Sequence, residues 1–302
     1  MAVSMLITHH THIAPFIEYL RFEKRYSQHT CISYATDLEQ FSNFIKKAYD
    51  DEPLDKVTAS FIRSWLAQMK ENKISSKTIN RKISALKSFF RFLIKQGVIN
   101  QTPMATISSP KTNKRLPVFV KEQHTETLLN HLEFSNNWQG RTEKLIIELL
   151  YNTGMRLSEL INLKEGQVDI GYAQLKVLGK GNKERILPLS HQLLAEIQDY
   201  IKNKPIKHES INELLVNEKG KPLYPKYVYR TVKKYLSLVT TLEKKSPHIL
   251  RHTFATHLMN NGAELNDVKE LLGHSSLAST QVYTHNTIEK LKEIHKRAHP
   301  KA

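Results

Sequence analysis

The stretch PHILRHTFATHL, residues 247–258, constrains the fold and chemistry of this sequence more than any other. His248, Arg251 and His252 stand at positions i, i+3 and i+4, so on a helix they share one face. The next acidic residue is Glu264. Taken alone, a helix face of one guanidinium and two imidazoles is usually a solvated surface, so an argument for a site needs further groups.

A second stretch, LLGHSSLASTQVYTH at residues 271–285, supplies such groups. Gly273 suits the left-handed position just past a helix end, and His274 follows it directly. Tyr283 comes nine residues after His274, inside another short helical pattern. Together the two stretches hold cations, imidazoles and one phenol. This combination suits a phosphate diester better than a sugar, a peptide or a metal ion.

A third group lies upstream, where an apolar helical pattern at residues 143–152 leads into TGMRLSEL, residues 153–160. Gly154 predicts the end of that helix, and Arg156 then begins a second, short helix. Glu159 stands three residues further on, where its carboxylate can brace the arginine. An arginine at such a junction can also form an ordinary ion pair with no role in chemistry.

Short strands are predicted next, at residues 168–170, 174–178 and 184–189. The last two are joined by GKGNK, residues 179–183, whose two glycines predict a hairpin tip. Lys180 and Lys183 would be exposed turn lysines by default.

These motifs resemble those of the tyrosine recombinase family, and RHTFATHL, residues 251–258, resembles the Xer branch of that family. TGMRLSEL resembles the first arginine box of the family. GKGNKER, residues 179–185, resembles its lysine hairpin, and the match falls on Lys180 rather than Lys183. The resemblance covers nearly the whole chain. It implies six catalytic residues: Arg156, Lys180, His248, Arg251, His274 and Tyr283.

The roles of these groups follow from the resemblance and from their chemistry. The two arginines would hold the non-bridging phosphate oxygens by bidentate bonds, and His274 would add a donor. Tyr283 would be the nucleophile, supported by His248, and Lys180 would protonate the leaving 5′ oxygen. Because a phosphotyrosine ester keeps the energy of the phosphodiester bond, no cofactor, ATP or metal ion is expected.

The resemblance implies a mainly α fold, with an N-terminal helical core-binding bundle before an α-rich catalytic domain that carries a small antiparallel β-sheet. We expect a bundle at residues 1–108, a basic linker at residues 109–117 and a catalytic domain at residues 118–302. Apolar residues at helical spacing between residues 12 and 96 predict four helices in the bundle. Basic side chains on the last of these helices and on the linker are expected to contact DNA: Lys77, Arg81, Lys87, Lys111, Lys114 and Arg115.

The resemblance also implies an assembly. Members of the family clamp a duplex between two domains, and four subunits on two sites exchange strands through a Holliday junction. We therefore expect a homo-tetramer on double-stranded DNA, with or without a second related recombinase. Residues 287–298 predict a last helix with only three well-spaced apolar side chains, Ile288, Leu291 and Ile294. The resemblance implies that this helix docks on the next subunit.

Composition agrees with a polyanionic partner. The chain has 45 basic and 29 acidic residues, a formal net charge of +16 over 302 residues. Its single cysteine, Cys31, excludes a disulfide framework and a thiolate zinc site. No apolar run of membrane-spanning length and no signal-peptide pattern is present. A cytoplasmic, nucleoid-associated protein is expected.

Three other functions fit the sequence less well. A metal hydrolase could use His248 and His252, which are spaced like helical zinc ligands, but Arg251 between them would repel a dication. A non-catalytic DNA-binding protein would not need all six catalytic positions filled. A type IB topoisomerase is nearest in chemistry, but the small size of the chain and its Xer-like motifs favour recombination. The target sequence stays open, as does the choice between chromosome dimer resolution, integration or excision of a mobile element, and inversion.

Overall fold

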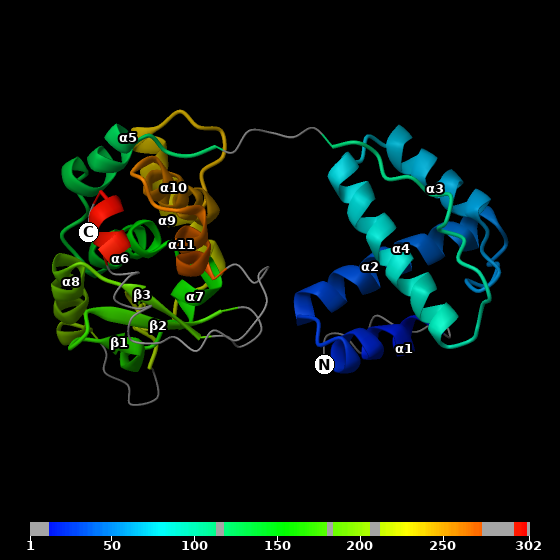
Figure 1. The fold of residues 1–302 in the computed structure, drawn as a ribbon, viewed down its shortest axis with the longest axis horizontal. Coiled ribbons are helices and arrows are strands. Elements are labelled where there is room, and N and C mark those ends of the chain that lie inside the picture. The colour runs from blue at the N-terminus through cyan, green and yellow to red at the C-terminus, as the bar shows by residue number, and fades with distance from the viewer. Residues whose placement is uncertain (1–11, 113–117, 180–183, 206–211, 274–292, 301–302) are drawn as a thin grey trace. The chain divides into compact units, whose positions relative to one another are not determined.

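The computed structural model describes residues 12–112, 118–179, 184–205, 212–273 and 293–300. The chain divides into two compact units, Met1–Arg115 and Leu116–Ala302, and each unit has its own hydrophobic core (Figure 1). Predicted catalytic residues Lys180, His274 and Tyr283 lie outside the described residues, as do Lys114 and Arg115.

The N-terminal unit is helical, as the spacing of its apolar residues predicts. Its helices are α1 (Ile13–Glu18), which continues as the π-helical η1 (Tyr19–Glu23), α2 (Gln28–Ala48), α3 (Ala59–Glu71) and α4 (Ser76–Lys95). Ser27 and Ser75 cap α2 and α4 by accepting the backbone N–H three residues on. Aromatic rings from three helices, Phe16, Phe41 and Phe89, are fully buried in the core.

The described segment that follows α4 has no helix or strand, but it packs on the N-terminal unit. Met104 and Ile107 are buried in the core of the N-terminal unit. Arg63 donates a hydrogen bond to Thr106 Oγ1 (2.7 Å), and Asn80 Nδ2 donates to the carbonyl oxygen of Pro110 (2.9 Å). Two buried apolar residues and two hydrogen bonds therefore anchor the chain to the bundle as far as Pro110.

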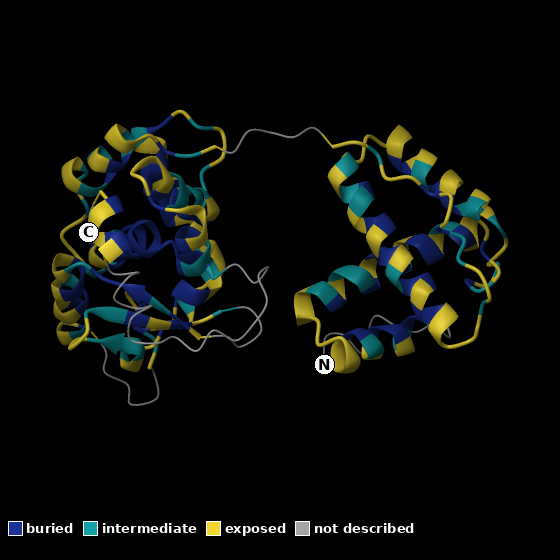
Figure 2. Cartoon of the chain, in the orientation of Figure 1, coloured by how far each residue is buried: buried dark blue, intermediate teal, exposed yellow. Residues whose placement is uncertain are grey.

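The C-terminal unit is built around α6 (Trp138–Thr153), which is buried on nearly every side (Figure 2). The other helices are α5 (Glu122–Glu126) with π-helical η2 (Thr127–His131), α7 (Leu157–Ile161), 3-10 helix η3 (Glu165–Gln167), α8 (His191–Lys202), α9 (Pro225–Val239), α10 (Pro247–Asn260) and α11 (Leu265–Leu272). The segment of α6 from Leu145 to Tyr151 is apolar apart from Glu148, whereas its first two turns carry polar side chains.

Three antiparallel strands complete this unit: β1 (Val168–Asp169), β2 (Gln174–Leu178) and β3 (Glu184–Pro188), in the order β1-β2-β3. The predicted strands and their hairpin pairing are confirmed. The register pairs Val177 with Arg185 and Leu175 with Leu187, and all four of these residues are buried. Because strand side chains alternate, this register turns Arg185 toward the interior.

Two glycines end helices in the left-handed conformation, as the sequence predicts. Gly154 has φ +59° after α6, and Gly273 has φ +64° after α11. Gly154 also faces a close neighbour, since a Cβ at this position would lie 2.4 Å from Cδ1 of the buried Phe254. Both the backbone conformation and the packing therefore require glycine.

Replacing Gly154 with alanine is expected to lower the free energy of unfolding by about 2–4 kcal/mol, the combined cost of a left-handed alanine and a methyl group forced against Phe254. Gly97→Ala is the matched control, because Gly97 has φ +68° with open space around its Cα. The control should lose only about 1–2 kcal/mol. Chemical denaturation of both variants measures the difference, and equal losses would contradict the packing argument.

The described end of the chain packs on its own unit, whereas Ile288 and Leu291 of the predicted last helix lie outside the described residues. Docking of that helix on a neighbouring subunit stays a prediction. Residues 293–298 are helical, and Ile294 and Ala298 are buried with Phe254. His295 Nε2 donates to Asn152 O (2.9 Å), and His299 Nε2 donates to Tyr151 O (3.3 Å). These are carbonyls of the last turn of α6, which otherwise lack a helical partner. Two buried histidines thus add to an apolar stripe that looks thin in the sequence.

Truncating the chain after Asn286 is therefore expected to destabilise the DNA-free monomer by about 2–4 kcal/mol, since it exposes apolar surface and leaves α6 carbonyls unpaired. Removal of residues 301–302 alone serves as the control. Thermal unfolding at fixed protein concentration measures the effect. A truncated monomer as stable as the full chain would contradict packing within one unit.

Within the described residues, no helix is both long enough and apolar enough to cross a membrane.

Candidate active site

Arg156 lies at the N-terminus of α7, where the chain turns after the left-handed Gly154. Its backbone N–H donates to Glu159 Oε2 (2.6 Å), and its Nη1 donates to Glu159 Oε1 (2.7 Å). Its Nη2 donates to the carbonyl oxygen of Gly273 (3.0 Å). The side chain is 27% exposed. The predicted bracing of Arg156 by Glu159 is present, and part of the guanidinium still faces solvent.

Arg251 lies on α10 and reaches the same place from another direction. Its Nη1 donates to Gly154 O and its Nη2 donates to Leu272 O, both at 2.6 Å. Burial, together with the positive charges of the nearby Arg156 and Arg185, lowers the pKa of Arg251 to about 9. The structure thus brings together two of the predicted catalytic residues, from helices far apart in the sequence.

A third arginine, Arg185 on β3, completes the group. Its Nη1 and Nη2 donate to Glu159 Oε1 (2.7 Å) and Oε2 (2.6 Å), and its Nε donates to Leu271 O (3.0 Å). It is 3% exposed. Sequence reasoning did not single out this residue. The signal was its place in ERILP, where the strand alternation that buries Leu187 also buries position 185.

We call Arg156, Arg185, Arg251 and Glu159 the arginine cluster. Three guanidiniums against one carboxylate leave it strongly positive. Burial would raise the pKa of Glu159, but hydrogen bonds and charge from Arg185, together with bonds from Arg156, lower it to about 2. The carboxylate therefore stays ionised at neutral pH, and the remaining positive charge suits an anion such as a phosphate.

Of the other four predicted catalytic residues, His248 is described, and Lys180, His274 and Tyr283 lie outside the described residues. His248 is exposed on α10, one turn before Arg251. His274 directly follows Gly273, whose carbonyl binds Arg156, and Lys180 belongs to the hairpin between β2 and β3. Tyr283 is placed by no described contact.

Four of the predicted DNA-contact residues lie within the described chain, and all four are exposed. Lys77, Arg81 and Lys87 are exposed on α4, and Lys111 is exposed after it. Arg81 is exposed but already has protein partners: it forms an ion pair with Asp37 and donates a hydrogen bond to Ser33 Oγ (2.7 Å). The neighbouring Lys82 is buried and also binds Asp37 (2.8 Å).

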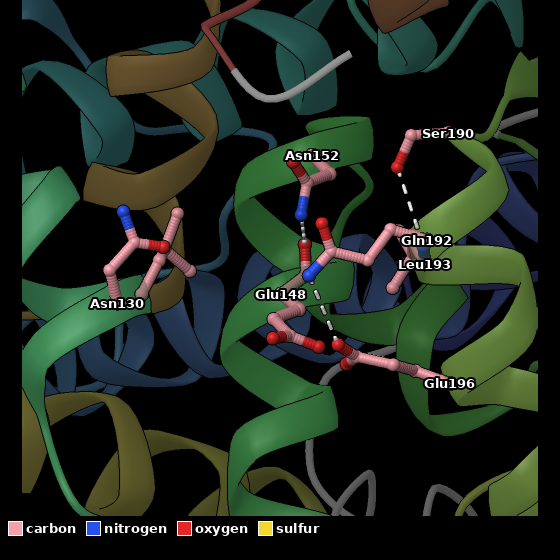
Figure 3. Close-up of a pocket in the computed structure, with 8 residues that line it drawn as sticks. Asn130, Glu148, Asn152, Ser190, Gln192, Leu193 and Glu196 are labelled. Carbon is pink, nitrogen blue, oxygen red and sulfur yellow. Dashed lines mark hydrogen bonds between the residues drawn. The ribbon is translucent and has the colours of Figure 1, made fainter.

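A small hollow of about 30 Å³ lies between α6, α8 and η2 (Figure 3). Glu148 and Glu196 face one another there, and Lys144 contacts both. Burial, together with the neighbouring Glu196, raises the pKa of Glu148 to about 8. The three predicted catalytic residues that are described, Arg156, His248 and Arg251, do not line this hollow, and its acidic lining does not suit a phosphate. Among the described residues, no group of three or more His, Cys, Asp or Glu side chains could hold a metal ion.

Family models and curated relatives match this chain along most of its length. The model of the phage integrase family matches residues 119–290, and that of the phage integrase N-terminal SAM-like domain matches residues 13–97. The tyrosine recombinase XerC of Chlorobaculum parvum is 35% identical over 96% of this chain and 94% of the relative. That of Listeria innocua is 37% identical over 95% of this chain and 97% of the relative.

Solved structures show the same fold. The XerH site-specific recombinase bound to a palindromic difH substrate has a TM-score of 0.71 at 24% identity, covering 92% of this chain and 81% of that one. The Tn1549 transposon integrase in complex with transposon right end DNA has a TM-score of 0.69 at 22% identity, covering 93% and 98%. With both domain models matched and relatives more than one third identical along almost the whole chain, the protein belongs to the phage integrase family and is a tyrosine recombinase of the Xer type.

Proposed function

We propose that this chain recombines specific double-stranded DNA sites by cleaving and rejoining strands through a 3′-phosphotyrosine intermediate and a Holliday junction. The observation that carries the proposal is the convergence of Arg156 and Arg251 on the end of α11, directly before His274. Two guanidiniums from separate helices can bind the two non-bridging oxygens of one phosphate, and His274 would add a donor. Fixed positive charge stabilises the charge that develops in the transition state.

Two of the remaining catalytic roles belong to Tyr283 and Lys180, which lie outside the described residues, and the third belongs to His248 on α10. The Tyr283 oxygen would attack the scissile phosphorus, forming a tyrosine–phosphate bond as the bond from phosphorus to the 5′ oxygen breaks. Lys180 would give its proton to that leaving oxygen, and His248 would support the loss of the phenol proton. A 5′ hydroxyl of the second duplex would then attack the phosphotyrosine, rejoin the DNA and release Tyr283. No bond energy is lost, so no metal ion or nucleotide cofactor takes part.

The proposed partners follow from the family. The names of the two structural relatives describe complexes with DNA substrates, which supports a double-stranded recombination site as partner. We propose a homo-tetramer on two such sites, with or without a second related recombinase, acting in the cytoplasm on the nucleoid. Residues 1–108 would form the core-binding domain, with Lys77, Arg81 and Lys87 toward DNA, and residues 109–117 a linker along the phosphates. Residues 118–302 would form the catalytic domain.

The direct test is covalent capture. Duplexes carrying candidate sites, nicked close to the expected cleavage position so that the released fragment diffuses away, are incubated with the protein in EDTA. A denaturing gel then reports any protein–DNA adduct, and sequencing of the trapped end gives the site. Adduct formation in EDTA supports the proposal, whereas strand cleavage that needs added magnesium or zinc would favour a metal hydrolase.

Salt should weaken DNA binding steeply. If about six phosphates are neutralised, affinity should fall about a thousandfold between 50 and 200 mM salt. Neutralising Lys111, Lys114 and Arg115 together should flatten the slope of log affinity against log salt by at most about three. The matched control removes three exposed lysines not assigned to DNA: Lys202, Lys219 and Lys221. Fluorescence anisotropy measures both, and an equal effect of the two triple variants would contradict the linker assignment.

A further inference from the structure

We infer that Arg185 is a positioning residue for strand cleavage, which holds Arg156 and the end of α11 in place without touching the DNA. The inference rests on the proposed function. Arg185 lies on β3, outside the six residues of the family resemblance, and it is almost wholly buried. Its importance follows from what its three nitrogen atoms bind.

The guanidinium neutralises the carboxylate that braces Arg156. Both oxygens of Glu159 accept from Arg185, and Glu159 Oε1 also accepts from Arg156 Nη1. Because Arg185 satisfies both oxygens, Glu159 holds Arg156 by one side-chain bond and one backbone bond rather than by a bidentate pair. Arg156 therefore keeps its charge and part of its donor fork available for a phosphate.

The same guanidinium fixes the turn that leads to His274. The carbonyls of Leu271, Leu272 and Gly273 follow one another at the end of α11, and each accepts a hydrogen bond from a different arginine. Leu271 O binds Arg185 Nε, Leu272 O binds Arg251 Nη2 and Gly273 O binds Arg156 Nη2. These carbonyls have no partner inside the helix, and they carry the negative end of its dipole. The turn and the three arginines thus form one unit.

The packing around Arg185 leaves little freedom for this unit. A Cβ at Gly273 would lie 2.9 Å from Arg185 Cδ, so the stem of Arg185 lies against the backbone of the turn itself. Lysine could reach Glu159 with its single ammonium group, but it could not also donate to Leu271 O along the planar fork of an arginine. Arg185→Lys keeps the buried positive charge while it removes this geometry.

The experiment compares single-turnover cleavage by the wild type and R185K on two nicked substrates. One carries the natural scissile phosphate, and the other carries an uncharged methylphosphonate at the same position. On the phosphate, R185K should cleave about 100-fold more slowly than the wild type, since displacement of a catalytic group by about 1 Å has an effect of this size. Its DNA affinity should stay within about threefold of wild type. The methylphosphonate carries no negative charge on its non-bridging oxygen, so its transition state needs less stabilisation by arginine. On this substrate R185K should cleave at most about tenfold more slowly than the wild type.

Two further variants separate positioning from stability. K176Q removes an exposed cation from the neighbouring strand β2, where Lys176 pairs with exposed Glu184, and it should cleave like the wild type. The double variant R185Q/E159Q removes both members of the buried Arg185–Glu159 ion pair together. It therefore provides a second measurement if R185K does not fold, and it should show the same dependence on the substrate. Equal losses on both substrates, or no loss in R185K, would overturn the inference. A wild-type chain that forms no adduct on its own site would instead overturn the proposed function, and this inference with it.

Discussion

Tyr283→Phe is expected to abolish the covalent protein–DNA adduct while leaving DNA binding intact. Phenylalanine has the same ring but lacks the oxygen that would attack phosphorus, so this variant cannot form the covalent adduct through residue 283. The expected result is an adduct below detection on nicked substrates, with an affinity for the site within about twofold of wild type. Gel-shift titration and a denaturing gel on the same samples measure the two properties separately.

Tyr229→Phe is the matched control, because Tyr229 is an exposed tyrosine of α9 outside the family motif. This variant should form the adduct at the rate of the wild type. An adduct that persists in Tyr283→Phe and disappears in Tyr229→Phe would move the nucleophile to α9 and contradict the proposed mechanism.

Glu159→Gln is expected to have the largest effect on stability, lowering the free energy of unfolding by about 3–5 kcal/mol at pH 7. The carboxylate is the only acidic partner described for Arg185 and Arg156, and removing one partner of a buried ion pair leaves the other charge uncompensated. Glutamine keeps the size of the side chain, so the loss reports charge rather than a cavity. Urea unfolding measures it. Glu184→Gln, which breaks an exposed pair with Lys176, should cost less than about 1 kcal/mol.

The same carboxylate should govern stability in acid. The pKa of Glu159 is about 2 in the folded protein against 4.5 as its ordinary value. Because the folded state holds the proton less tightly, Glu159 contributes stability at pH values above about 4.5, and this contribution disappears as the pH falls toward 2. The difference between the two pKa values corresponds to a contribution of about 3 kcal/mol to the free energy of unfolding. Unfolding curves at pH 7, 5 and 3 should therefore show a steeper acid loss for the wild type than for Glu159→Gln. Parallel curves would contradict the assignment.

Local patterns in the sequence predicted most of the secondary structure. The helices of the bundle, the helix that ends before Gly154, the three strands with their antiparallel pairing, and the left-handed glycines after α6 and α11 were all predictable. Each depends on residues within a few positions of one another, through side-chain periodicity, helix caps or turn preferences. The contact of Arg156 with Glu159 belongs to this class, because three residues separate the partners on one short helix. The motif resemblance then gave the family.

The tertiary structure alone decided the contacts between distant segments. Arg185 and Glu159 are 26 residues apart, and Arg185 and Leu271 are 86 apart. The anchoring of Met104 and Ile107 to the bundle and of His295 and His299 to α6 are likewise long-range. Sequence spacing cannot reveal these contacts, because a buried arginine or histidine looks like a surface residue until the partners that satisfy its donors are known. The register of β3 and the packing of α6, α10 and α11 bring those partners together, so the arginine cluster exists only in the folded chain.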